Sequence, residues 1–385
     1  KIQWCAVGEK GELPLTVNIY PIQFPEKTTL LLGGWDYLDG KGSYNVNPEN
    51  RASFLKYVTS RHVNAPWGKG GVLESCKVNA DLSVTLDTAR FDEWVAMYPN
   101  ANEYFVFLGK GGWSSQSAPK FLGYELNSPK GRTVVKNFFA AWKEHWTKIG
   151  FDPKKLSILI HDEPNEGTQM AQFTLWNEIF HEACPEIQIW SDPCYRDLTK
   201  VPAEYMQGID TLCPNRTQWL EQPAAFEKFY VPLRQEGKTL HLYSCTGPAR
   251  ELDPYSYYLL QAWHAARIGA KASFFWAMGD GGGTNSWAEY FLGRNAYCPL
   301  YIDPKSPAVT PAKQMEAMSE SAQDYEYIMM LREKCPEHTT ELDKLLDSVL
   351  QAPDADEIHW KDPKDRSLTE KARLQILTWL MEAEK

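Results

Sequence analysis

The sequence lacks the features that mark membrane-spanning, nucleic-acid-binding and zinc-binding proteins. No apolar run is long enough to cross a bilayer. The net charge is -10 and no block of lysine and arginine occurs, which argues against nucleic acid as a partner. None of the 8 cysteines forms a CxxC pair or joins a compact His/Cys cluster, so no metal site is predicted. We expect free, buried thiols, with one or two disulfides as the alternative in an exported protein.

Two further signals are missing near the amino terminus. The chain begins at Lys1 and shows no signal peptide, so we interpret it as a mature or trimmed chain. The run Gly33-Gly34-Trp35 has neither the Rossmann nor the P-loop spacing of glycines, and no cofactor is predicted.

Aromatic residues, by contrast, are abundant. They make up 13% of the chain, with 15 tryptophans and 19 tyrosines. Aromatic faces stack against the apolar C–H faces of sugar rings, so this composition favours a carbohydrate ligand. An aromatic-rich core explains the same numbers, and composition alone does not choose between the two.

The most informative stretch for fold and function is residues 156–164, Leu-Ser-Ile-Leu-Ile-His-Asp-Glu-Pro. Its first five residues predict a strand buried on both faces, and Pro164 ends the strand because proline has no N–H to donate. Apolar residues at helical spacing predict a helix over residues 165–184. Asp162 and Glu163 are therefore expected at the carboxyl end of a parallel strand, directly before a helix. Parallel α/β folds place their chemistry at that edge, so we interpret the pair as functional rather than as a helix cap.

Strand–helix alternation repeats over residues 29–334 and indicates one α/β catalytic domain. Eight such units match a closed (β/α)8 barrel of the TIM type better than an open doubly wound sheet. Residues 1–28 are expected to form a short β arm, with weak alternation over residues 13–20, and residues 335–385 a carboxy-terminal helical extension. The predicted strands cover residues 30–35, 63–67, 103–109, 156–160, 187–192, 210–215, 240–245 and 272–277.

In a closed barrel the residues at the strand ends share one face. Here that face combines carboxylates with aromatic side chains. A glycosidase requires both, because aromatic surfaces position the sugar and acids act on the glycosidic oxygen. We predict Asp162 and Glu163 as the catalytic residues. The predicted substrate-binding residues are Trp35, Trp67, His161, Trp190, Asp192, Asn215, Tyr243, Trp276, Asp280 and Trp287.

The seventh strand lacks the nucleophile that an ordinary retaining glycosidase needs about 5 Å from its acid. The commonest clan of barrel glycosidases places that carboxylate after strand seven. This chain has Tyr243-Ser244-Cys245 there, and its next carboxylate is Glu251. An adjacent Asp-Glu pair without an enzyme nucleophile fits attack by the substrate's own 2-acetamido oxygen. Glu163 then protonates the leaving oxygen, while Asp162 orients the acetamido N–H and offsets the charge of the oxazolinium intermediate.

Two alternatives stay open at this point. In one, a glycosidase of other specificity uses Glu163 as its acid and Asp192 or Asp280 as the second carboxylate. In the other, the barrel binds carbohydrate without cleaving it.

Several motifs, read in order, resemble the catalytic domain of glycoside hydrolase family 123, and the resemblance covers roughly residues 13–334. It departs from the family before Gln323, where Met318-Ser319-Glu320-Ser321-Ala322 replaces an expected Arg and acidic-Gly pair. The motifs that carry it are His161-Asp162-Glu163-Pro164, the stretch 257–276 ending Ala-Ser-Phe-Phe-Trp, Tyr301-Ile302-Asp303-Pro304, and Gln323-Asp324-Tyr325-Glu326-Tyr327.

This resemblance implies a retaining β-N-acetylgalactosaminidase that uses substrate-assisted catalysis without a cofactor. Glu163 would be the acid/base and Asp162 the acetamido-orienting residue, while the departure before Gln323 bears on the sugar specificity. A glycan or glycoconjugate substrate further implies a bacterial protein that is exported to the periplasm, the cell surface or the medium. Members of the family often carry a β-sandwich ahead of the barrel, so residues 1–28 are interpreted as its remnant.

Overall fold

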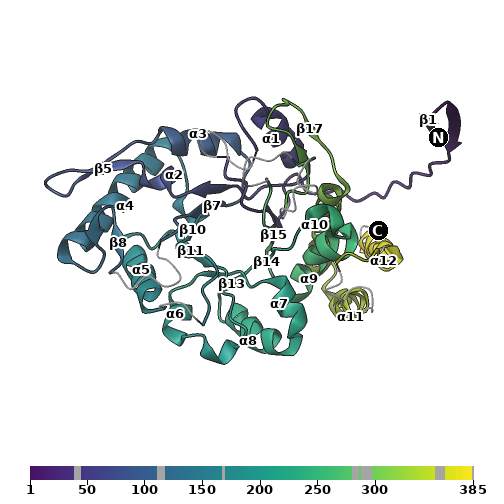
Figure 1. Cartoon of the computed structure of the whole chain (residues 1–385). Coiled ribbons are helices and arrows are strands. Elements are labelled where there is room, and N and C mark those ends of the chain that lie inside the picture. The colour runs from purple at the N-terminus through teal and green to yellow at the C-terminus, as the bar shows by residue number, and fades with distance from the viewer. Residues whose placement is uncertain are drawn as a thin grey trace.

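The structure is a computed structural model that describes residues 1–38, 45–110, 118–166, 170–279, 286–287, 297–351 and 360–383. At its centre short parallel strands form a barrel surrounded by helices, which confirms the predicted (β/α)8 fold (Figure 1). The barrel strands are β3 (Leu31–Gly33), β4 (Trp67–Lys69), β7 (Tyr104–Phe107), β10 (Leu156–Leu159), β11 (Gln188–Ser191), β12 (Thr211–Leu212), the split strand β13 (Thr239–Leu240) and β14 (Leu242–Ser244), and β15 (Ala272–Phe275).

Two parallel sheets and two single bridges close the barrel. Six strands pair in the order β13-β12-β11-β10-β7-β4, and three more pair in the order β14-β15-β3. A bridge between Gly33 and Ala65 joins the first strand to the second, and one between Asn215 and Tyr243 joins the sixth to the seventh. Because all these pairs are parallel, the carboxyl ends of the strands lie on one edge of the barrel. Asp162 and Glu163, after β10, and Asp192, after β11, therefore lie at this edge.

Helices cover the outside of the barrel (Figure 1). In α4 (Pro129–Ile149), the Ser128 hydroxyl accepts a hydrogen bond from the Gly131 amide at 3.0 Å, Pro129 is the first helical residue, and Gly150 ends the helix with a φ of 73°. These helices are α1 (Arg51–Thr59), α2 (Gly71–Glu74), α3 (Ala89–Met97), α4 (Pro129–Ile149), α5 (Met170–Ala183), α6 (Ala203–Gln207), α7 (Arg216–Glu221), α8 (Pro223–Gln235), a π-helical turn (Pro254–Leu259) leading into α9 (Leu260–Ile268), and α10 (Lys313–Lys334).

In the loops that the structure describes, three antiparallel hairpins have no counterpart among the predicted elements. They are too short for alternation to reveal them, with two or three residues in each strand. They pair β5 (Cys76–Val78) with β6 (Val84–Leu86), β8 (Lys120–Phe121) with β9 (Tyr124–Glu125), and β16 (Tyr301–Ile302) with β17 (Val309–Thr310).

Aromatic rings fill much of the barrel interior, where branched aliphatic residues dominate in most barrels of this type. Trp67 stacks on Trp35 and on Phe105, with ring centroids 4.6 and 4.9 Å apart. Trp190 meets Trp67 edge-on at 5.1 Å and donates its indole N–H to Nδ1 of His241 at 3.0 Å. Each such aromatic pair adds about 0.5–1.5 kcal/mol beyond the burial of its area. Much of the aromatic surplus therefore serves packing.

The first strand ends in two glycines because the barrel wall leaves no room for a Cβ atom. A Cβ on Gly33 would lie 2.8 Å from the carbonyl oxygen of Ala65. On Gly34, whose φ is 146°, it would lie 2.0 Å from the carbonyl oxygen of Phe275. These glycines let the first strand approach its two neighbours, and so they close the barrel.

The second strand is displaced from its predicted position. The sequence places it at residues 63–67 with Trp67 at the rim, whereas β4 begins at Trp67 and runs to Lys69. Pro66 does not end the strand, because its carbonyl accepts the Phe105 amide at 2.9 Å and the ladder continues with Trp67 opposite Phe105. Trp67 therefore lies inside the barrel.

Residues 165 and 166, where the sequence predicts the start of the helix after the fourth strand, are not helical, and α5 is described from Met170. Asn165 instead donates its side-chain amide to the carbonyl of Glu163 at 3.1 Å. Asp162 and Glu163 are therefore followed by a loop, and the prediction that they directly precede a helix is wrong. The helix that the sequence also predicts over residues 221–235 is α8, and the short helix α7 before it was not predicted.

The amino-terminal β arm is a hairpin of β1 (Ile2–Ala6) and β2 (Glu9–Leu13), which extends away from the barrel in Figure 1. Val7 and Gly8, with φ values of 50° and 85°, form its two-residue turn. The weak alternation over residues 13–20 is misleading, because no strand extends beyond Leu13 there.

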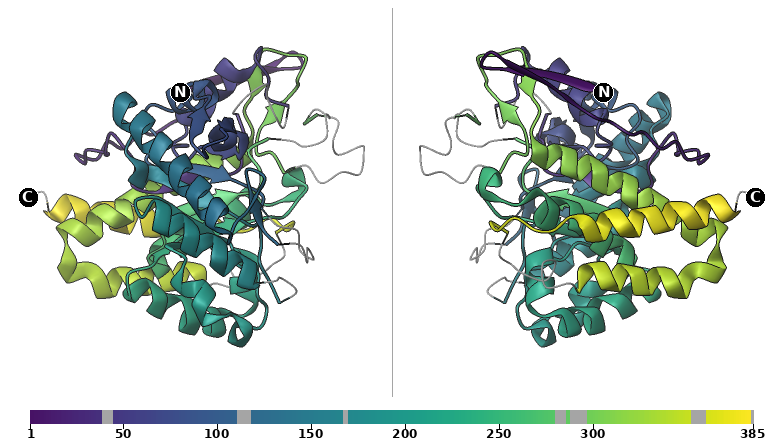
Figure 2. Two further views of the ribbon diagram at one scale, coloured as in Figure 1. Left: turned by 90° about the vertical axis from the view of Figure 1, so that its left-hand side faces the viewer. Right: turned by 90° about the vertical axis from the view of Figure 1, so that its right-hand side faces the viewer.

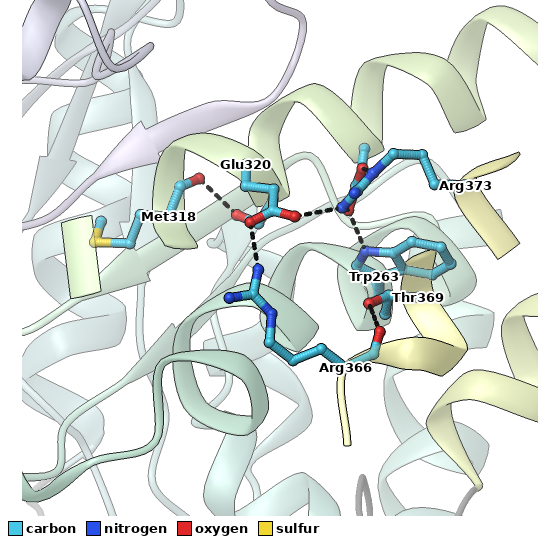
Figure 3. A network of polar contacts seen from close by, with 8 residues as sticks. Trp263, Met318, Glu320, Arg366, Thr369 and Arg373 are labelled. Carbon is cyan, nitrogen blue, oxygen red and sulfur yellow. Dashed lines mark hydrogen bonds and ion pairs between the residues drawn. The ribbon is translucent and has the colours of Figure 1, made fainter. Parts of the chain in front are cut away.

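The carboxy-terminal helical extension consists of α11 (Thr339–Leu350) and α12 (Ser367–Ala383), which lie on one side of the molecule (Figure 2). Figure 3 shows the polar network that ties α12 to the barrel. Arg373 donates to Asp324 at 2.8 Å and to Glu320 at 2.7 Å, and Trp263 donates to Asp324 at 2.9 Å. Asp324 is 2% exposed, so this is a buried ion pair between α12 and α10.

The segment 323–327 also fixes α10 to the barrel strands. The Glu326 carboxylate accepts the backbone amides of Thr29 and Leu30 at 2.7 and 2.9 Å. The Tyr325 hydroxyl donates to the Ala270 carbonyl at 2.9 Å. This motif therefore joins the last barrel helix to the segments that precede the first and eighth strands.

All 8 cysteines are free thiols, as the sequence predicts. Half of them are buried, and Cys5 and Cys245 are exposed. Among the helices of the described residues, none is long and apolar enough to span a membrane.

Candidate active site

The Asp162-Glu163 pair lies at the carboxyl edge of the barrel, just beyond β10. Both side chains are half-buried, so both are accessible from this edge. Glu163 has a φ of 44°, an uncommon conformation for a residue with a side chain. Its backbone amide donates to Oδ1 of Asp192 at 3.1 Å, which holds the chain in this turn.

Further hydrogen bonds join the loop after β10 to the loop after β11. The Cys194 amide donates to the Pro164 carbonyl at 2.9 Å. The amides of Arg196 and Asp197 both donate to Oε1 of Glu166 at 3.0 Å, and these bonds lower the pKa of Glu166. The pair is thus supported by a second loop and not by β10 alone.

Tyr243 fixes the side chain of Glu163. Its hydroxyl donates to Oε1 of Glu163 at 2.6 Å and lies 3.0 Å from Sγ of Cys194. The tyrosine is 2% exposed, and burial raises its pKa well above the ordinary value. It therefore remains a neutral donor that orients Glu163 from the seventh strand.

Three carboxyl groups influence one another at this edge. Burial and the charge of Glu163 raise the pKa of Asp162 to about 6, while a hydrogen bond with the side chain of Asp192 opposes this shift. Burial, together with the charges of Asp162 and Glu163, raises the pKa of Asp192 well above its ordinary value. Asp192 is 1% exposed, so it lies beneath the accessible pair and does not reach a substrate directly.

Cys245 occupies the end of the seventh strand, where the commonest clan of glycosidases carries a nucleophilic carboxylate. The residue is exposed at the edge. Desolvation of its thiol, together with the charges of Glu163, Asp162 and Asp192, raises the pKa of the thiol to about 12. Near neutral pH it is therefore a thiol, a much weaker nucleophile than a thiolate.

Three of the predicted sugar-binding tryptophans are packing residues in this structure. Trp35, Trp67 and Trp190 are 2%, 0% and 1% exposed and pack on one another inside the barrel. Their rings already contact protein on their faces and edges, which leaves little aromatic surface for a sugar. Prediction from strand ends failed here because residues near a strand end also point into the barrel.

Trp276 and Trp287 are more open. Trp276 is half-buried beside Trp35, with ring centroids 5.6 Å apart. Trp287 is 53% exposed and stacks on Tyr301 at 4.1 Å, and the Arg250 guanidinium covers the Tyr301 ring at 3.8 Å. Asp280, the other residue predicted from this region, lies outside the described residues.

His161 and Asn215 are engaged with the protein. His161 is 6% exposed and stacks on Phe173 of α5 at 4.0 Å, and burial lowers its pKa. The side-chain oxygen of Asn215 accepts the amides of Thr217 and Gln218 and caps α7. The histidine thus packs between barrel and helix, and the asparagine has a structural role at the edge.

Cys194 and Cys245 belong to the site and were not predicted. Cys194 contacts Tyr243, and Cys245 interacts with all three carboxyl groups. An isolated cysteine carries no spacing signal, so only the folded arrangement reveals these two. Among the described residues, no group of three or more His, Cys, Asp or Glu side chains is arranged to hold a metal ion.

A cavity of about 470 Å³ lies elsewhere on the barrel. Its lining includes Thr28, Asn64 and Asn102, which come before β3, β4 and β7, so it opens at the amino-terminal edge. The opposite edge carries the carboxylates, and barrel enzymes place their chemistry there. The cavity is therefore not part of the candidate site.

Solved structures of other proteins resemble this chain. A family 123 glycoside hydrolase from Clostridium perfringens, solved in a study of glycolipid glycan hydrolysis, aligns with a TM-score of 0.60 at 10% identity and covers 92% of this chain and 68% of that one. The chain has the fold of a family 123 glycoside hydrolase. No protein-family model and no curated protein sequence matches it.

Two other glycoside hydrolase barrels are less similar to this chain. The catalytic domain of the major endoglucanase from Xanthomonas campestris pv. campestris aligns at 10% identity over 77% of this chain and 94% of that one, with a TM-score of 0.46. A family 5 xyloglucanase from Paenibacillus pabuli aligns at 12% identity over 76% and 99%, also with a TM-score of 0.46.

Proposed function

We propose that the chain is a retaining glycoside hydrolase that cleaves β-linked N-acetylgalactosamine with the help of the substrate's 2-acetamido group. The observation that carries the proposal is the arrangement of the three carboxyl groups. Asp162 and Glu163 are accessible together at the catalytic edge, whereas Asp192 is withdrawn beneath them. The family 123 fold and the motif Asp162-Glu163-Pro164 support the same assignment.

In the first step the acetamido oxygen attacks the anomeric carbon, and the bond to the leaving oxygen breaks. Glu163 gives its proton to that oxygen, in the orientation set by Tyr243. Asp162 accepts the acetamido N–H, which aligns the attacking oxygen and offsets the charge of the oxazolinium ion. In the second step a water attacks the anomeric carbon, the bond between that carbon and the acetamido oxygen breaks to restore the acetamido group, and the Glu163 carboxylate takes a proton from the water. Two inversions at that carbon give overall retention.

Burial of Asp192 argues against the alternative in which this residue is the nucleophile. A carboxylate nucleophile must be exposed to the bound sugar, because it attacks the anomeric carbon on the face opposite the leaving group. Asp192 is 1% exposed, and its Oδ1 is already bonded to the Glu163 amide. Substrate assistance needs no such residue, so it agrees better with the geometry.

The experiment compares aryl β-glycosides of N-acetylgalactosamine and of galactose, which differ in the 2-substituent. We expect turnover of the acetamido sugar only, with a β product formed first. In addition, Glu163→Gln should reduce the hydrolysis rate most for substrates with poor leaving groups. Asp162→Asn should reduce the hydrolysis rate of every substrate by about a hundredfold or more, whatever its leaving group. Equal turnover of the two sugars would refute acetamido assistance, and binding of the acetamido sugar without turnover would indicate a carbohydrate-binding barrel instead.

A further inference from the structure

Asp192 is the most deeply buried group of the carboxyl cluster, and substrate-assisted cleavage as described above does not use it. Its two oxygens have different surroundings. Oδ1 accepts the Glu163 amide at 3.1 Å, while Oδ2 is buried and receives no hydrogen bond from the residues that the structure describes. The side chain of Asp162 lies near enough for the two carboxyl groups to influence each other's pKa, and to share a hydrogen bond once one of them carries a proton. Two ionised carboxylates cannot make such a bond, because neither has a proton to donate.

We propose that Asp192 is a positioning residue that keeps a proton and donates it to Asp162, so that Asp162 stays ionised and turned toward the substrate's acetamido N–H. This inference rests on the proposed function, since it assigns a task to Asp162 in that reaction. Oδ2 would carry the proton, and Oδ1 would continue to accept the Glu163 amide. One buried side chain would then hold both members of the catalytic pair.

The surroundings of Asp192 favour the protonated form. A buried carboxyl group without a cation partner is more stable neutral than charged. Among the described residues, the groups that interact with it electrostatically come from the ends of four strands and from α6, and none of these groups is a cation. They are Asp162, Glu163, Cys194, Tyr205, Cys213, Tyr243 and Cys245.

Asp192→Asn tests the inference directly, because asparagine keeps one acceptor oxygen and always carries N–H donors. If the wild-type carboxyl group is protonated, the asparagine side chain reproduces both of its hydrogen bonds. Asp192→Leu has a similar size and reproduces neither bond. We expect the leucine variant to lose about a hundredfold or more in kcat/KM, as when an oriented donor is removed, and the asparagine variant to lose much less.

The pH profile separates positioning from a purely structural role. An activated aryl glycoside is used, because its leaving group needs little protonation by Glu163. We expect the wild-type kcat/KM to fall at alkaline pH as Asp192 loses its proton, and Asp192→Asn to lack this alkaline fall. An unchanged alkaline limb in the asparagine variant, or an asparagine variant as damaged as the leucine variant, would overturn the inference.

Asp210→Asn is the matched control. Asp210 also accepts a backbone amide, from Ile189 at 2.7 Å, but it precedes β12 and so lies at the opposite edge of the barrel. Its replacement should leave the alkaline limb as it is in the wild type. A change of equal size at Asp210 would mean that the limb reports on the fold and not on Asp192, which also overturns the inference.

Infrared difference spectroscopy provides a readout that does not depend on turnover. The spectrum of wild type minus Asp192→Asn at neutral pH should contain the C=O band of a protonated carboxyl group. Carboxylate bands in its place would refute the inference. If the band is present but no variant cleaves any glycoside, then the proposed function fails while the shared proton stands.

Discussion

Tyr243→Phe tests how much the orientation of Glu163 contributes to the reaction. The substitution removes one hydroxyl group and keeps the ring, which packs edge-on against Trp35 at 5.8 Å inside the barrel. The lost bond is the 2.6 Å hydrogen bond to Oε1 of Glu163. A hydrogen bond to a charged group contributes about 1.5–3 kcal/mol, and about 1.4 kcal/mol corresponds to a factor of ten in rate. We therefore expect kcat/KM to fall by about 10- to 150-fold.

The assay is the hydrolysis of an aryl β-N-acetylgalactosaminide, and Tyr230→Phe is the control. Tyr230 is also buried, at 1% exposure, but its hydroxyl makes no hydrogen bond with the described residues. The control should retain wild-type activity and stability. Wild-type kcat/KM in Tyr243→Phe, with the fold intact, would refute the role of Tyr243 in orienting the acid.

Three further predictions concern pH and stability. Asp162 must be ionised to accept the acetamido N–H, and its pKa is raised to about 6, so kcat/KM should fall as the pH drops through about 6; a profile flat down to pH 4 would contradict this. Burial lowers the pKa of both His241 and His264 to about 3, so the unfolded chain binds protons that the folded chain does not. As the pH falls below about 6.5, the free energy of unfolding measured in urea should decrease by about 1.4 kcal/mol per pH unit for each histidine. His264→Gln should reduce this slope, and an unchanged slope would contradict the assignment of a buried neutral His264. Arg373→Met leaves the buried Asp324 without its cation and should lower the free energy of unfolding by about 3 kcal/mol. Arg132→Met, at a more exposed ion pair, should lower it by about 1 kcal/mol or less. Equal losses in the two variants would refute the stabilising role of the buried Arg373–Asp324 pair.

The barrel was predictable because its signals are local and repeat along the chain. The run from Leu156 to Ile160 followed by Pro164 gives both a buried strand and its end, and it places Asp162 and Glu163 at the edge. The eight-fold repeat of such units then selects a closed barrel. The (β/α)8 fold followed from these patterns even though the individual strands are only two to four residues long.

The direction of individual side chains was less predictable, because it depends on strand register. Trp67 was expected at the rim, but β4 begins at this residue, so its ring lies within the barrel. From the sequence, Asp192 was also predicted to be an accessible carboxylate. Its burial depends on how the loops after β10 and β11 join, through the Glu163 and Cys194 amides, and no local pattern encodes those contacts.

Inhibition by a thiazoline derived from N-acetylgalactosamine tests acetamido participation most directly. This compound mimics the oxazolinium intermediate, and such mimics bind far more tightly than substrates or products. We predict competitive inhibition with a Ki at least about a hundredfold below that of N-acetylgalactosamine itself, and a large loss of this preference in Asp162→Asn. A wild-type enzyme that binds the thiazoline no more tightly than the free sugar would contradict the account.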